Sequence, residues 1–154
     1  MKRMLVVVDG SVQANLALDQ ALEIAQALPS SEVLLLNITP APSPWQMLRP
    51  VPRALREISE RVMTLALQRA KSAGVKAEAR VEPGETAEVT TRIAHEERCD
   101  HIFLPEQEST PVARALLTLA GLSAHTAASR VISLSDVPVT VIARERVRER
   151  AERA

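Results

Sequence analysis

Short apolar runs alternate along the chain with stretches in which apolar residues recur every three or four positions. The first run covers residues 4–8, contains three consecutive valines and is followed by Asp9, Gly10 and Ser11. Five aliphatic residues are too few for a typical helix and are typical of a strand buried on both faces of a parallel sheet. Asp9 and Gly10 indicate a sharp turn, and Ser11 is a favourable N-cap for a following helix. This stretch therefore predicts the first half of a βα unit.

The same alternation continues over most of the remaining chain. Helical spacing is found between residues 14 and 28, and Pro29 ends that pattern. Further helices are predicted over 53–73, from about 86 to 99, over 111–120 and across 124–132. Further strands are predicted over 33–38, 75–81, 101–104 and 137–143. Five strands that alternate with helices indicate an α/β fold with a mostly parallel sheet.

The helix over 53–73 and the strand that follows it carry further signals. The apolar stripe of this helix consists of Leu55, Ile58, Val62 and Leu65. Gly74 occupies the C′ position that closes such a helix. In the strand over 75–81, apolar and charged residues alternate strictly. This alternation predicts one solvent-exposed face and therefore a place at the edge of the sheet.

Composition limits the classes of partner. The chain has 154 residues, a formal net charge of zero and only two aromatic residues, Trp45 and Phe103. It therefore offers neither a basic field for DNA or anionic lipid nor a row of stacking platforms for single-stranded nucleic acid. The longest apolar runs are strand-sized, far short of the ~20 residues that span a bilayer. Because Met1 leads directly into a strand, we expect no signal peptide and a soluble, cytoplasmic protein.

Five short segments stand out in their order along the chain: Val6–Ser11, Asn37–Pro40, Ala73–Val75, Glu82–Glu85 and Ser135–Val141. Taken in that order, they resemble the universal stress protein family over nearly the whole sequence. The resemblance implies a five-stranded parallel sheet of order 3-2-1-4-5 with helices on both faces, an adenine nucleotide alpha hydrolase-like, Rossmann-like fold. It also implies one domain over residues 1–143, followed by a charged tail over 144–154.

The branch of this family that binds ATP carries the signature G-x2-G-x9-G-S/T after the fourth strand. Here Pro105 and Glu108 stand where the first two glycines belong, and His125 with Thr126 stands where the final pair belongs. Proline has no N–H to donate to a phosphate, and Glu108 adds a negative charge. Thr126 and the helix N-terminus behind it still favour an anion. The sequence therefore predicts no family-type ATP binding and no cofactor.

Part of the nucleotide site is still matched. The resemblance places Val8, Asp9 and Gly10 in the segment that meets the sugar and base side of the nucleotide. It places Ile38 and Thr39 at the strand end that presents backbone groups to adenine. Asp9 has two readings, a vestigial ligand contact or a carboxylate that caps its own turn. One alternative function is therefore a diverged nucleotide or small-molecule sensor that retains the adenosine half of the site.

Other candidate chemistry has little support. Of the three histidines, His95, His101 and His125, the first two share no obvious face with a further ligand, so no metal site is expected. The single Cys99 excludes an intramolecular disulfide and, beside Asp100, reads as a buried inert thiol. Since no nucleophile–base pair is visible, we expect a protein without enzymatic activity.

The remaining prediction is assembly. The family commonly forms homodimers by pairing the fifth strands, and residues of that strand would otherwise form an open apolar edge. The expected interface residues are Val139, Thr140, Val141, Ile142 and Ala143. The resemblance thus implies a non-enzymatic stress-response or signalling module that acts through its homodimer and contacts with an unknown protein partner. The apolar helix Pro111–Ala120 either caps the sheet end, fills the old nucleotide crevice or contributes to a protein-contact surface.

Overall fold

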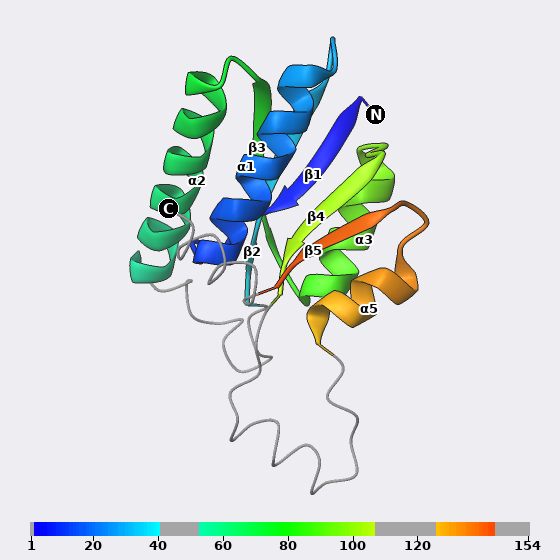
Figure 1. Ribbon diagram of the computed structural model, residues 1–154. Helices are drawn as coiled ribbons and strands as arrows, with labels where there is room; N and C mark the ends of the chain where they lie inside the picture. The colour runs from blue at the N-terminus through cyan, green and yellow to red at the C-terminus, as the bar shows by residue number, and fades with distance from the viewer. Residues whose placement is uncertain (1, 41–52, 107–125, 144–154) are drawn as a thin grey trace, which may run out of the picture.

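Five parallel strands form a single sheet in the order β3-β2-β1-β4-β5 (Figure 1). The computed structural model describes residues 2–40, 53–106 and 126–143. The strands are β1 (Arg3–Val7), β2 (Glu32–Thr39), β3 (Lys76–Pro83), β4 (His101–Pro105) and β5 (Val139–Ile142). This order confirms the predicted α/β sheet, with β3 and β5 at its two edges.

Helices cover both faces of the sheet. They are α1 (Val12–Ala27), α2 (Arg53–Ser72), α3 (Thr86–Glu96) and α5 (Ala127–Leu134). Figure 1 shows α1 and α2 on one face and α3 and α5 on the other. Along β1, Met4 and Val6 belong to the core on the α1 and α2 side, whereas Leu5 and Val7 belong to the core on the α3 and α5 side. The central strand is therefore buried on both faces, as its run of aliphatic residues predicts.

Most of the predicted apolar stripe of α2 does not face the sheet. Val62 is half-buried and packs against the core, but the exposed fractions of Leu55, Ile58 and Leu65 are 40%, 59% and 55%. An amphipathic helix ordinarily buries such a stripe. In α2 the buried face instead consists of Ser59, Met63, Ala66 and Ala70. These mostly small side chains recur every three or four residues, so they form a second stripe on which the helix packs against β2 and β3.

The strand β3 is confirmed as an edge strand, but its alternation does not translate fully into burial. Ala77 packs against the core, whereas Ala79 is exposed and Val81 is 48% exposed. Gly74 has a φ of +70° after the end of α2, and the Val75 N–H donates to the Ala70 carbonyl at 3.0 Å. This left-handed residue closes the helix as predicted.

Several element boundaries differ from those predicted. The helix α3 ends at Glu96 rather than near Cys99, because Arg98 adopts a left-handed conformation with a φ of +52°. In α5, Val131 is fully buried but Ile132 is 55% exposed.

Within the described residues, no helix is long and apolar enough to cross a membrane. The predictions for Trp45, Glu108, the helix Pro111–Ala120, Ala124, His125 and the tail over 144–154 lie outside the described residues.

Candidate functional site

The carboxyl ends of β1 and β2 are joined by direct hydrogen bonds. The Val8 N–H donates to the Leu36 carbonyl at 2.8 Å, and the Asn37 Nδ2 donates to the Val8 carbonyl at 2.7 Å. Asn37 is only 6% exposed, and its Oδ1 has no hydrogen-bond partner. In the sequence, the indication of Asn37 is that its amide side chain interrupts an otherwise apolar predicted strand. Asn37 fixes the two strand ends on which five of the predicted ligand residues lie.

The turn after β1 is held by its own polar side chains. The Ser11 N–H donates to Asp9 Oδ1 at 2.8 Å, and the Ala14 N–H donates to Ser11 Oγ at 3.1 Å. Gly10 has a φ of +83°, and a Cβ at this position would lie 3.0 Å from Val62 Cγ2. The carboxylate of Asp9 therefore caps its own turn, one of the two readings of this residue. A contact between Asp9 and a ligand stays a prediction.

The other predicted ligand residues also have structural partners. The Thr39 carbonyl accepts from the Gly84 N–H at 3.0 Å, and Ile38 packs against the core on the α3 side. Thr126 caps α5, because its Oγ1 accepts from the Ser129 N–H at 3.2 Å. Figure 1 shows the start of α5 at the same edge of the sheet as the carboxyl ends of the strands. The fold thus brings the six predicted ligand residues to the carboxyl end of the sheet, as expected for an open parallel sheet.

A cavity of about 410 Å³ opens beside the carboxyl end of β1, between α1 and α2. Of the predicted ligand residues, Val8 and Gly10 line it, together with Ile58, Val62 and Leu65 of α2. The others, Asp9, Ile38, Thr39 and Thr126, are not among its lining residues. The cavity therefore lies on the α1 and α2 side of β1. The site predicted from the sequence includes no residue of α2.

The two edges of the sheet differ in charge. The side chains of β5 are uncharged, and Val139, Thr140 and Val141 are half-buried. Thr140 Oγ1 lies 2.8 Å from His101 Nε2, and burial lowers the pKa of His101. The opposite edge strand, β3, carries Lys76, Glu78, Arg80 and Glu82. Charged side chains on an edge strand oppose pairing with another chain. Of the two edges, β5 is the one without this protection.

Residues 1–143 match the model of the universal stress protein family. The chain belongs to this family. No curated protein is significantly similar to it in sequence. Solved structures that resemble this universal stress protein share its fold at low identity. The hypothetical protein MJ0577 is 23% identical, with 93% of this chain and 96% of that chain covered and a TM-score of 0.73.

Two further structures are described as nucleotide complexes. The universal stress protein from Archaeoglobus fulgidus in complex with dAMP is 18% identical, with 92% of this chain and 98% of that chain covered and a TM-score of 0.65. A universal stress protein family protein from Arabidopsis thaliana with AMP bound is 17% identical, with 94% and 92% covered and a TM-score of 0.60. At these identities, the similarity establishes the shared fold.

In this family member, Pro105, the residue predicted to stand at the first glycine position of the ATP signature, is part of the sheet. Pro105 is the last residue of β4 and is buried. Directly after it, the Glu106 N–H donates to the Ile142 carbonyl at 3.0 Å. A residue without an N–H is accommodated here because β4 continues its pairing with β5 through Glu106. The first backbone donor after β4 is thus engaged within the sheet.

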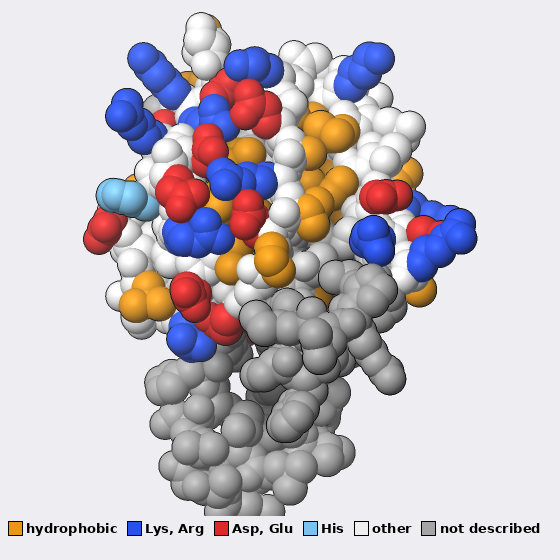
Figure 2. Space-filling model, turned by 180° about the vertical axis from the view of Figure 1, so that it is seen from behind, with side chains coloured by type: hydrophobic (Ala, Val, Ile, Leu, Met, Phe, Trp, Pro, Cys, Tyr) orange, Lys and Arg blue, Asp and Glu red, His pale blue; other side chains and the backbone are white. Residues whose placement is uncertain are grey.

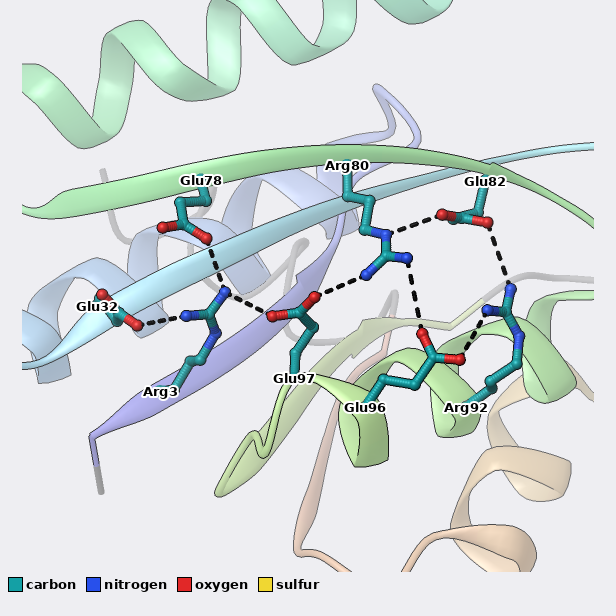
Figure 3. A network of polar contacts seen from close by, with 8 residues as sticks. All are labelled: Arg3, Glu32, Glu78, Arg80, Glu82, Arg92, Glu96 and Glu97. Carbon is teal, nitrogen blue, oxygen red and sulfur yellow. Dashed lines mark hydrogen bonds and ion pairs between the residues drawn. The ribbon is translucent and has the colours of Figure 1, made fainter.

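This universal stress protein also carries a network of charged side chains on the α3 side of the sheet (Figure 3). Its members are Arg3, Glu32, Glu78, Arg80, Glu82, Arg92, Glu96 and Glu97. Arg3 contacts carboxylates of β2, β3 and the end of α3 at 2.6–3.0 Å. Figure 2 shows blue and red side chains gathered over this face. The network covers sheet surface beside α3.

Hydrogen bonds in this network and around it shift the pKa values of carboxyl groups. A hydrogen bond from Lys76 lowers the pKa of Glu32, and one from Arg80 lowers the pKa of Glu82. Burial raises the pKa of the neighbouring Cys99 thiol to about 11, so this group stays protonated at neutral pH. Among the described residues, no group of three or more His, Cys, Asp or Glu side chains is placed to hold a metal ion.

Proposed function

We propose that this protein is a non-enzymatic stress-response module that acts as a homodimer joined through β5 and does not bind ATP in the family's usual mode. The observation that carries the proposal is the contrast between the two sheet edges. The side chains of β5 are uncharged, with Val139, Thr140 and Val141 half-buried and Ile142 buried, whereas those of β3 are alternately charged. An uncharged edge strand is a template for pairing with another chain.

The direction of the backbone groups supports pairing at β5. The Ile102 N–H donates to the Pro138 carbonyl, and the Glu106 N–H donates to the Ile142 carbonyl, both at 3.0 Å. The direction of backbone N–H and C=O groups alternates along a strand. The backbone groups of Pro138, Thr140 and Ile142 therefore face β4, and those of the residues between them face outward. The outward N–H and C=O groups therefore include those of Val141. A second copy of β5 would satisfy them.

The dimer is tested by light scattering on the full chain at micromolar concentration. We expect a mass of two chains for the native protein. Val141→Pro deletes an outward donor and leaves the bonds between β4 and β5, so it should give a folded monomer. Val141→Lys provides a second test, because a charge on the edge opposes pairing without a backbone change. A monomeric native protein, or folded variants that remain dimeric, would refute the proposal.

The proposal also concerns nucleotide chemistry. Pro105 cannot donate a hydrogen bond to a phosphate, and each hydrogen bond lost to a charged group costs about 1.5–3 kcal/mol of binding. We therefore expect no thermal shift with sub-millimolar ATP and no ADP release above the buffer rate. A shift of several degrees with ATP, or ATP turnover that Asp9→Ala abolishes, would contradict this part of the proposal.

A second candidate function is a sensor that retains the adenosine half of the site. It is favoured by the structures described with AMP and dAMP, and by Val8 and Gly10, which line the cavity beside β1. Its test is a titration with AMP and ADP. A saturable shift with AMP that Asp9→Ala reduces, without any shift from ATP, would favour the sensor. Equal responses of the native protein and Asp9→Ala would count against it.

A further inference from the structure

The cavity between α1 and α2 has the size and lining of a small-molecule site. Its volume of about 410 Å³ lies within the ~300–1,000 Å³ typical of such sites. Six of its ten lining residues are apolar. The buried Val8 at the end of β1 and Ala66 of α2 are among them. The cavity is therefore an apolar recess whose inner residues belong to the core.

Part of its wall is formed by the outward-facing stripe of α2. Ile58 and Leu65 line the cavity and are 59% and 55% exposed. Single exposed apolar side chains are ordinary, but these two border one recess on the same helix. Covering them with an apolar group removes their surface from water, which is favourable. The stripe thus selects a ligand with an apolar body.

The charges around the cavity favour one negative group. Glu57 lines the cavity, but its carboxylate is paired with Arg53 Nε at 2.7 Å. Arg61 also lines the cavity and has no ion pair within the described ranges 2–40, 53–106 and 126–143. The start of α1 borders the cavity through Gly10 and Asn15. The Asp9 carboxylate already accepts from the Ser11 N–H there, so the preference for an anion rests on Arg61.

We propose that this cavity binds a small amphipathic anion, a carboxylate carried on an aliphatic body. Arg61 contacts the carboxylate, since a guanidinium and a carboxylate form paired, charge-assisted hydrogen bonds. Ile58 and Leu65 cover the aliphatic body. Four of the six predicted nucleotide-site residues do not line this cavity. The site therefore overlaps the adenosine half-site only at Val8 and Gly10, and it shares no residue with β5.

The test uses decanoate as the probe, below its micelle concentration, with the native full-length chain and isothermal titration calorimetry. We expect saturable binding of one decanoate per chain. Acetate lacks the apolar body, decanol lacks the charge and decyltrimethylammonium carries the opposite charge, so each should bind at least about tenfold more weakly. Equal binding of decyltrimethylammonium, or no saturable binding of decanoate at millimolar concentration, would overturn the proposal.

Variants of α2 locate the site. Arg61→Gln should weaken decanoate binding at least about tenfold, the loss expected for a hydrogen bond to a charged group. Arg56→Gln removes the same charge from a residue of the same helix that does not line the cavity, and should leave binding unchanged. Leu65→Gln should weaken binding of decanoate without affecting the fold, as checked by circular dichroism. Equal effects of Arg61→Gln and Arg56→Gln would refute a specific site.

Discussion

Three glycines with positive φ allow the conformational and steric costs of an added methyl group to be separated. Gly74 has a φ of +70° and open space around its Cβ position. Gly10 has a φ of +83°, but its Cβ would lie 3.0 Å from Val62 Cγ2. Gly84 has a φ of +147°, and its Cβ would lie 2.5 Å from Val89 Cγ2. Replacement of each by alanine should therefore destabilise the fold to a different degree.

The magnitudes follow from these geometries. A left-handed alanine costs about 1–2 kcal/mol, and the lower entropy of the unfolded chain offsets about 0.4–1 kcal/mol. Gly74→Ala should therefore lower the free energy of unfolding by about 1 kcal/mol. Gly10→Ala adds a tight contact with Val62, and overpacking typically costs about 1–3 kcal/mol, so a total of about 2–4 kcal/mol is expected. Gly84→Ala combines a φ that alanine rarely adopts with a true overlap, so it should cost about 3 kcal/mol or more.

The assay is urea denaturation followed by circular dichroism, at one protein concentration because dimerisation would couple to stability. The decisive control is the pair Gly10→Ala and Val62→Ala. If Val62 Cγ2 is the obstacle, the double variant should be less destabilised than the sum of the single variants by about 1 kcal/mol. Strict additivity, or equal losses for Gly74→Ala and Gly84→Ala, would refute the reasoning.

Three further predictions concern acid stability, thiol reactivity and the core. The pKa values of Glu32 and Glu82 are lowered in the folded protein. The contribution of these two carboxylates to the stability of the fold is therefore complete above their ordinary pKa of 4.5, and it is lost as the pH falls through their lower pKa values in the folded state. The urea midpoint should therefore hold at neutral pH and fall in acid below about pH 4.5, and Glu82→Gln should reduce this acid sensitivity. Cys99 is 4% exposed with a pKa of about 11, so at pH 8 it should react with a thiol reagent at least about a hundredfold more slowly in the native than in the unfolded chain. Ile93 is fully buried and Ile132 is 55% exposed. In denaturation experiments, Ile93→Ala should lower the free energy of unfolding by about 2–5 kcal/mol, and Ile132→Ala should lower it by less than about 1 kcal/mol.

The sheet was largely predictable because its signals are local. A run of aliphatic residues before Asp9 is compatible with little besides a buried strand, and Gly74 marks a helix end by its backbone freedom alone. The orientation of α2 was not predictable in the same way. Its sequence contains two stripes at helical spacing, one of larger and one of mostly small side chains. The choice between them depends on how closely the helix approaches β2 and β3, which no local pattern encodes.

The site was only partly predictable for a related reason. The residues at the strand ends were assigned by the resemblance to the family, and the structure brings them to the carboxyl end of the sheet. The cavity beside them depends on the spacing between α1 and α2. The charged network was missed because Arg3 and Glu78 are 75 residues apart. Their pairing follows from the register of three strands, and sequence spacing carries no information about it.

The charges on β3 also bear on how large an assembly this fold allows. A dimer that pairs β5 with β5 would form one continuous sheet with a copy of β3 at each outer end. Both outer ends would then carry the charged side chains of Lys76, Glu78, Arg80 and Glu82. Such ends discourage the addition of further chains. In such a dimer, the same distribution of charge that leaves β5 open would also stop growth at two copies and so oppose a fibre.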